Sequence, residues 1–202
     1  MSTEKNKQFA TNALHAGHDP KLTGGTRAVP IYQSTAYVFD SAEHAANLFS
    51  LAEPGNIYTR INNPTTDILE QRLAALEGGI ASVVTASGTA AIATSLLVLL
   101  KAGDHIVASN SLYGGTYNLL NVTLPRLGIT TTFVDPSDPA NFELAVQENT
   151  RAFFAESLGN PKLDVLDLRL TCAFKISNIF IKLVSRENIF SSLKFRPSPG
   201  IR

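Results

Sequence analysis

The chain has 202 residues, of which 44% are hydrophobic and 17% are charged, and its formal net charge at pH 7 is zero. This length and composition are typical of a globular protein with one sizeable domain. The lack of a net basic charge argues against nucleic acid or an anionic membrane surface as a partner.

The charge is nevertheless divided along the chain. Residues 1–168 carry 10 Lys or Arg and 16 Asp or Glu, whereas residues 169–202 carry seven basic residues and one acidic residue. The single cysteine, Cys172, cannot form an internal disulfide, which favours a reducing compartment. The longest apolar run, Ala90–Leu100, is well short of the ~20 residues that span a bilayer. Because the N-terminus is also polar, without a signal-peptide core, we expect a cytoplasmic protein.

The first 64 residues are expected to form an N-terminal arm with little regular structure. Residues 1–30 show no sustained periodicity, and Pro30 makes a central strand improbable in the β-like stretch that follows, 29–39. A short helix is predicted over 41–51, with Ser41 as its N-cap, and a loop over 57–64.

From residue 65 onward, helices and strands are predicted to alternate. The helices are expected at 66–76, 89–100, 116–127 and 141–148, and the strands at 81–85, 105–109, 129–134 and 151–156. Alternation with short connections is typical of an α/β fold, in which helices cover both faces of a mostly parallel sheet. The pattern ends after Asp167, and no strands are expected in the basic tail, 169–202.

Ligands of an open parallel sheet bind at the carboxyl ends of its strands. Three segments follow predicted strands and are expected to face one crevice: 86–89, 111–115 and 156–161. In the first, Ser87-Gly88-Thr89 opens an apolar helix, whose free backbone N–H groups and dipole favour a phosphate. An ordinary strand-to-helix turn with a capping hydroxyl has the same sequence pattern.

Other candidate residues are less distinctive. Tyr113, beside two glycines, could stack on a flat ring or act as a general acid or base, although most tyrosines of this kind only pack. Arg60, which shares a loop with Tyr58, could clamp a phosphate or be an ordinary surface charge. Asn160 fits a turn before Pro161. The four histidines have no metal-ligand spacing, so no metal site is expected.

Taken in order along residues ~9–167, five motifs resemble the Cys/Met-metabolism family of pyridoxal-phosphate enzymes. They are Leu14-His15-Ala16-Gly17, Tyr58-Thr59-Arg60-Ile61-Asn62-Asn63-Pro64-Thr65, Ala86-Ser87-Gly88-Thr89-Ala90-Ala91-Ile92, Ser111-Leu112-Tyr113-Gly114-Gly115-Thr116 and Glu156-Ser157-Leu158-Gly159-Asn160-Pro161. Two stretches, 27–35 and 55–60, are most similar to the O-acetylhomoserine sulfhydrylase branch of that family.

The resemblance implies a truncated large domain of a fold-type I pyridoxal-phosphate enzyme and a role for seven residues. Backbone N–H groups of Gly88 and Thr89 would hold the phosphate of pyridoxal 5'-phosphate, and Tyr113 would stack on its ring and assist departure of the leaving group. Asn160 would contact the ring's hydroxyl side, with Glu156 nearby. Tyr58 and Arg60 would reach the cofactor phosphate of a neighbouring subunit, which implies a homo-oligomer.

The reaction implied is γ-replacement, in which O-acetylhomoserine and sulfide or a thiol give homocysteine or methionine. A cystathionine γ-synthase or a methionine γ-lyase-like enzyme is an alternative within the family. A further alternative is a non-catalytic fragment that co-assembles with full-length subunits.

The family's Schiff-base lysine, in a Ser-x-Thr-Lys run after Asn160-Pro161, is absent. None of Lys175, Lys182 and Lys194 lies in a comparable context, and Lys162 follows Pro161 too closely. We therefore expect the chain to be inactive as it stands. The expected organisation is an arm and inter-subunit segment (1–64), a partial cofactor-binding domain (65–168) and an unrelated tail (169–202), which a retained intron or a frameshift would explain.

Overall fold

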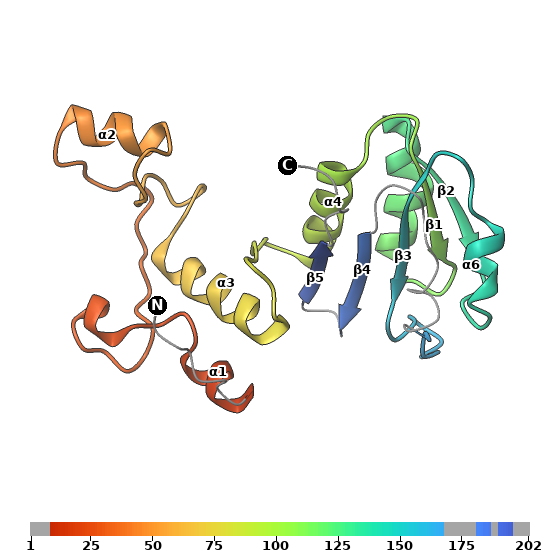
Figure 1. Cartoon of the computed structure of the whole chain (residues 1–202), viewed down its shortest axis with the longest axis horizontal. Coiled ribbons are helices and arrows are strands. Elements are labelled where there is room, and N and C mark those ends of the chain that lie inside the picture. The colour runs from red at the N-terminus through yellow and green to blue at the C-terminus, as the bar shows by residue number, and fades with distance from the viewer. Residues whose placement is uncertain (1–8, 168–180, 187–189, 196–202) are drawn as a thin grey trace, which may run out of the picture. The chain divides into compact units, whose positions relative to one another are not determined.

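The computed structural model describes residues 9–167, 181–186 and 190–195 (Figure 1). Two compact units make up the chain, the first from Met1 to Val84 and the second from Thr85 to Arg202. Each unit is described by itself below. Cys172 and Lys175 lie outside the described residues.

The first unit is built from short helices: α1 (Phe9–His15), the 3-10 helix η1 (Pro20–Thr23), α2 (Ala42–Phe49) and α3 (Pro64–Glu77). As predicted, Ser41 caps α2, and its hydroxyl accepts a hydrogen bond from the His44 N–H at 3.0 Å. At the end of α3, Gly78 adopts a left-handed conformation with φ of 66°, which a glycine allows at little cost.

The expectation of an arm without regular structure over 1–30 is wrong, because α1 and η1 both lie there. Tertiary contact with α3 compensates for the weak local pattern. Arg72 of α3 donates a hydrogen bond to the Ala16 carbonyl at 2.9 Å, and α1 packs on α3. The β-like stretch 29–39 forms one isolated bridge, between Ala36 and Tyr58, in place of a strand.

The strand predicted over 81–85 is also wrong. Val83 is 81% exposed, and no described strand pairs with this segment. A strand requires a neighbour for its backbone hydrogen bonds. Here Glu70 takes that role in part, because its side chain accepts from the Val84 N–H at 2.8 Å and its carbonyl accepts from the Ser82 hydroxyl at 2.6 Å.

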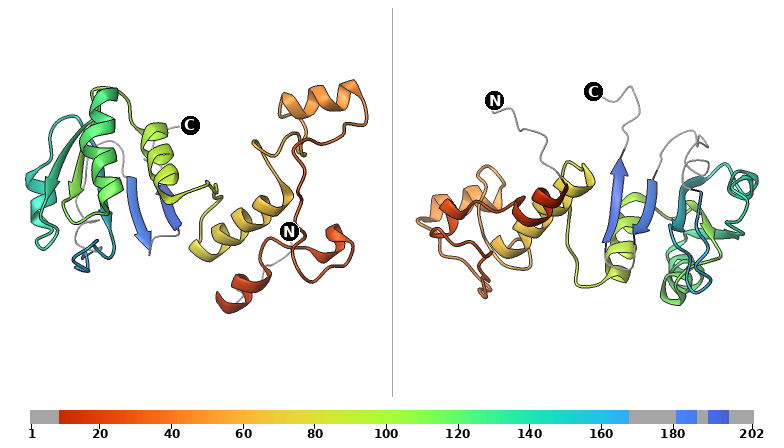
Figure 2. Two further views of the ribbon diagram at one scale, coloured as in Figure 1. Left: turned by 180° about the vertical axis from the view of Figure 1, so that it is seen from behind. Right: turned by 90° about the horizontal axis from the view of Figure 1, so that it is seen from below.

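The second unit is an α/β domain (Figure 2). Its elements are α4 (Gly88–Leu99), β1 (His105–Ser109), α5 (Gly114–Asn118), η2 (Leu119–Thr123, π-helical), η3 (Leu124–Leu127, 3-10), β2 (Thr130–Val134), α6 (Ala140–Leu144), β3 (Thr150–Glu156), β4 (Ile181–Arg186) and β5 (Phe190–Phe195). The predicted elements from 89 to 156 are confirmed, with two differences. The last predicted helix, α6, ends at Leu144. The third predicted helix begins at Gly114 and is a continuous run of three helix types, α5, η2 and η3.

The sheet has the strand order β2-β1-β3-β4-β5. All neighbours are parallel except β4 and β5, which pair antiparallel. The expectation that no strands follow Asp167 is wrong, because β4 pairs with β3 and β5 pairs with β4. Short runs of β-branched, aromatic and alternating residues, such as those at 181–186 and 190–195, become strands where a neighbouring strand edge is available.

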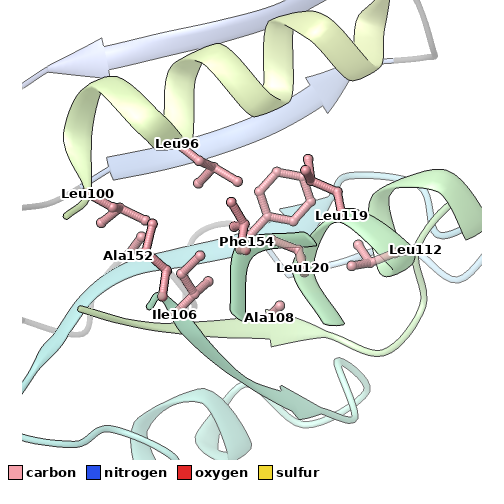
Figure 3. Close-up of a cluster of buried hydrophobic side chains, with 11 residues drawn as sticks. Leu96, Leu100, Ile106, Ala108, Leu112, Leu119, Leu120, Ala152 and Phe154 are labelled. Carbon is pink, nitrogen blue, oxygen red and sulfur yellow. The ribbon is translucent and has the colours of Figure 1, made fainter. Parts of the chain in front are cut away.

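Helices cover both faces of this sheet. Ile106 and Ala108 of β1 and Ala152 and Phe154 of β3 join α4 and the α5–η3 helices in one buried cluster (Figure 3). The alternate residues of the same strands, among them Val107 and Phe153, pack on the other face against Phe142 of α6. The α/β prediction is thus confirmed. Within the described residues, no helix has the length and apolarity to cross a membrane.

Candidate functional site

The start of α4 presents unpaired backbone donors to solvent. The Ser87 hydroxyl caps the helix by accepting from the Ala90 N–H at 3.1 Å. Within the described residues, the N–H groups of Gly88 and Thr89 donate to no protein atom, and both residues are exposed. Free amides at the positive end of a 12-residue helix are suited to bind a phosphate.

The core contacts of α4 place this helix start at the carboxyl edge of the sheet. Leu100, directly after the helix, lies beside Ala152 and Ile106 near the beginnings of β3 and β1 (Figure 3). Leu96, one turn earlier, lies beside Phe154, further along β3. The helix therefore runs antiparallel to both strands, and its first residues point toward the edge where β1 and β3 end.

The segment after β1 carries Tyr113 at that same edge. Tyr113 is 51% exposed, and its ring leans over Gly115, since a Cβ added to Gly115 would lie 2.5 Å from the Tyr113 Cε1 atom. The Ser109 hydroxyl accepts from the Ser111 N–H at 2.9 Å, which fixes the turn out of the strand. An accessible aromatic face at the same edge of the sheet as free amides can hold a flat ring that bears a phosphate.

Glu156, the last residue of β3, is 9% exposed and accepts a hydrogen bond from the Tyr113 N–H at 3.0 Å. Burial raises the pKa of the Glu156 carboxyl, and the hydrogen bond from Tyr113 partly offsets this. The residue thus supports the segment that carries the aromatic ring.

The segment after β3 forms a narrow hairpin with Asn160 at its tip. The Gly159 N–H donates to the Asp164 carbonyl at 2.8 Å, and the Leu166 N–H donates to the Ser157 carbonyl at 3.2 Å. Asn160 is half-buried, and its side chain hydrogen-bonds to no atom of the described residues. An amide side chain in this state is available to a ligand.

Two residues that tie this hairpin to the site were missed in the sequence. The Ser111 hydroxyl donates to Oδ1 of Asp164 at 2.6 Å, and Ser111 is 3% exposed. The signal for Asp164 was the Gly-Asn-Pro turn, because a tight hairpin around Asn160-Pro161 places residue 164 opposite Gly159.

Tyr58 and Arg60 lie in the first unit, and the other five predicted residues lie in the second. The Arg60 guanidinium stands 4.7 Å from the centre of the Tyr58 ring, a cation–π arrangement. Asn62 and Asn63 hold this loop. The Asn62 amide donates to the Gly55 carbonyl at 2.7 Å, and the Asn63 amide donates to the Tyr32 carbonyl at 2.9 Å. No group of three potential metal ligands occurs in the described part of the chain.

Comparison with known proteins gives consistent matches. The sequence model of the family "Cys/Met metabolism PLP-dependent enzyme" matches residues 10–197. An O-acetyl-L-homoserine sulfhydrylase of Leptospira meyeri is 59% identical over 167 residues, and a homocysteine synthase of Schizosaccharomyces pombe is 52% identical over 163 residues. These matches cover 83% and 81% of this chain. The chain spans 38% of the length of each of these relatives.

A solved structure has the same fold. It is that of a putative O-acetylhomoserine (thiol)-lyase from Campylobacter jejuni, which contains N'-pyridoxyl-lysine-5'-monophosphate. The two structures agree with a TM-score of 0.83 at 38% sequence identity. The match covers 89% of this chain and 44% of that protein.

Proposed function

Because the chain belongs to the Cys/Met metabolism family of pyridoxal-phosphate-dependent enzymes, we propose that it is the N-terminal part of an O-acetylhomoserine sulfhydrylase. Such an enzyme exchanges the acetate of O-acetylhomoserine for sulfide or a thiol and yields homocysteine or methionine. The observation that carries the proposal is the joint position of free amides (Gly88, Thr89), an accessible ring (Tyr113) and an unpaired amide side chain (Asn160) at one edge of the sheet. The 59% identity to the Leptospira meyeri enzyme supports the substrate assignment.

The residues of the second unit fit pyridoxal 5'-phosphate. The amides of Gly88 and Thr89 would bind its phosphate, and Tyr113 would stack on its ring with the phenol hydroxyl placed to move a proton. Asn160 would donate to the ring's hydroxyl side. The bound cofactor supplies an electron sink that labilises protons of an amino-acid substrate. Glu156 holds the backbone of Tyr113 and so orients the residue that handles the proton.

Assembly would complete the site. We propose that Tyr58 and Arg60 reach the phosphate bound by a neighbouring copy, so that the working enzyme is a homo-oligomer. The guanidinium offers the planar fork that suits a phosphate, and the Asn62 and Asn63 contacts support its loop. A cytoplasmic location and small-molecule substrates are part of the same proposal.

The 202 residues alone would not turn over substrate. No Ser-x-Thr-Lys run occurs in the sequence, and such a lysine binds the cofactor covalently in this chemistry. Reduction of the purified chain with borohydride in the presence of pyridoxal phosphate, followed by peptide mass spectrometry, tests this. We expect no specific adduct. A stoichiometric adduct on Lys175, Lys182 or Lys194 with turnover of O-acetylhomoserine would overturn it.

A chimaera tests the substrate assignment. Residues 1–167 would replace the corresponding part of the Leptospira meyeri enzyme, and homocysteine would be measured with O-acetylhomoserine and sulfide. We expect activity, and Tyr113→Phe in the chimaera should lower kcat about 100-fold, the scale of a lost general acid or base. A folded, cofactor-loaded chimaera that is inactive would contradict the proposal.

A further inference from the structure

A side-chain hydrogen bond attaches the hairpin that carries Asn160 to the strand-end segment of β1. Inside the hairpin, backbone hydrogen bonds join Gly159 to Asp164 and Leu163 to Gly159, at 2.8 and 2.9 Å. Across to β1, the Ser111 hydroxyl donates to the Asp164 carboxylate at 2.6 Å. A charge-assisted hydrogen bond of this length is among the stronger kinds in proteins.

Packing at Gly159 shows how closely the two segments meet. Gly159 is buried, and a Cβ at this position would overlap both the Asp164 carboxylate and the Ser111 hydroxyl. Three residues thus share one contact point, directly before Asn160. The hairpin cannot rotate about its base without breaking the hydrogen bond between Ser111 and Asp164.

The same strand-end segment is held a second time, two residues further on. There the Glu156 carboxylate accepts from the Tyr113 N–H. Two carboxylates from β3 and its hairpin therefore fix both ends of the stretch from Ser111 to Tyr113. Glu156 holds the backbone of the ring-bearing residue, and Asp164 ties Ser111 to the hairpin that carries Asn160.

We infer that Asp164 is a positioning residue. Through its hydrogen bond with Ser111, Asp164 holds Asn160 and Tyr113 at the separation that lets Tyr113 stack on a pyridine ring while Asn160 contacts the hydroxyl side of the same ring. The inference rests on the proposed cofactor site. Asp164 touches neither the ring nor the phosphate. Its loss should therefore weaken ring recognition and leave phosphate recognition at Gly88 and Thr89 unchanged.

Binding of two probes to the full chain separates these effects. Pyridoxamine 5'-phosphate offers ring and phosphate without an aldehyde that would label surface lysines, whereas inorganic phosphate offers only the anion. For Asp164→Ala we expect about tenfold weaker binding of pyridoxamine 5'-phosphate, the equivalent of one displaced hydrogen bond, and unchanged binding of phosphate. Asp164→Asn keeps an acceptor oxygen and should restore binding. The double variant Ser111→Ala/Asp164→Ala should be no weaker than either single variant.

Asp67→Ala is the matched control, because Asp67 accepts a side-chain hydrogen bond from Gln71 at 2.7 Å within α3 of the first unit. Unchanged pyridoxamine 5'-phosphate binding by Asp164→Ala, or equal loss of both probes, would overturn the inference. If the unmodified chain binds neither probe, the proposed cofactor site fails for this chain. Amide hydrogen exchange over 157–166 then decides the positioning role: faster exchange in Asp164→Ala supports it, and unchanged exchange refutes it.

Discussion

The Glu156 carboxylate accepts a hydrogen bond from the backbone N–H of Tyr113 at 3.0 Å, across from the end of β3 to the segment after β1. The two residues are 43 positions apart in the sequence. This contact satisfies the backbone donor of Tyr113. Because Glu156 is buried, its carboxyl group is also poorly hydrated. Glu156 therefore holds the backbone of Tyr113 through a carboxyl group whose pKa is raised by burial.

Replacement of Glu156 should change how stability depends on pH. The folded-state pKa is raised above 4.5 by burial, so the stabilising contribution of the protonated carboxyl is complete below pH 4.5 and is lost as the pH rises through the folded pKa. The variant Glu156→Gln keeps a side-chain oxygen that can accept from the Tyr113 N–H, and it cannot ionise, so it removes this loss of stability at higher pH. Urea unfolding between pH 4.5 and 8 should show a smaller decline for the Gln variant. Parallel curves for the two proteins would contradict the expectation.

Gly115→Ala should displace the Tyr113 ring with little effect on folding. A Cβ here would meet the ring at 2.5 Å, and a ring can swing away. Alanine also favours the helix by about 0.5–1 kcal/mol over glycine. We expect about tenfold weaker binding of pyridoxamine 5'-phosphate, as for the loss of one contact. Gly114→Ala is the control, because nothing lies within 4 Å of its added Cβ. Equal binding by both variants would show that the ring does not contact the ligand.

Local signals in the sequence predicted the elements that depend on local physics. Ser41 as the N-cap of α2 is a property of one turn of chain, and it was identified. The β1 and β3 strands were also found, because every residue of β1 is buried and the apolar runs reflect this.

Features that depend on distant partners were not predictable in this way. Residues 81–85 have strand composition, yet they find no strand to pair with in the described structure, whereas 181–186 pair with β3 despite a weaker pattern. Asp164 was missed because its role is set by Ser111, 53 residues earlier. Composition alone does not reveal such pairs.

We expect the chain to be poorly soluble or partly unfolded. Large apolar side chains of the described residues are exposed in both units, with Val38 at 95% and Val98 on α4 at 77%. Exposed apolar patches promote association. Size-exclusion chromatography with a thermal melt checks this, and Val98→Lys should raise the monomer fraction. A sharp cooperative melt of a soluble monomer from the unmodified chain would count against the expectation.

Gly17→Ala should loosen the N-terminal arm from α3. Gly17 has φ of +77°, and an added Cβ would lie 2.5 Å from the Ile68 carbonyl oxygen. The combined backbone strain and overpacking should lower the free energy of unfolding by about 3 kcal/mol. Gly24→Ala isolates the backbone cost of about 1 kcal/mol, because Gly24 has φ of +68° with nothing within 4 Å of its Cβ. Limited proteolysis of the arm should accelerate in the Gly17 variant far more than in the Gly24 variant.

His105 should make the second unit sensitive to acid. It is 1% exposed at the start of β1, and its two ring nitrogens lie 2.8 Å from the Thr150 hydroxyl and 2.9 Å from the Thr132 hydroxyl. Burial lowers its pKa below 6.5, so the folded protein holds the neutral ring while the unfolded chain takes up a proton. Stability is therefore full above pH 6.5 and falls as the pH drops below that value, by at most about 1.4 kcal/mol per pH unit.

His105→Gln removes the titrating group and keeps donors and acceptors for the two hydroxyl groups. The variant should be less stable than the unmodified chain at pH 7.5, since Gln cannot reproduce the reach of the ring, but its urea midpoint should change less between pH 7.5 and 5.5. His18→Gln, at a half-buried position in the first unit with one hydroxyl partner, is the control for replacement of a histidine outside the second unit. If His105→Gln loses as much stability on acidification as the unmodified chain, another group is the source of the acid sensitivity.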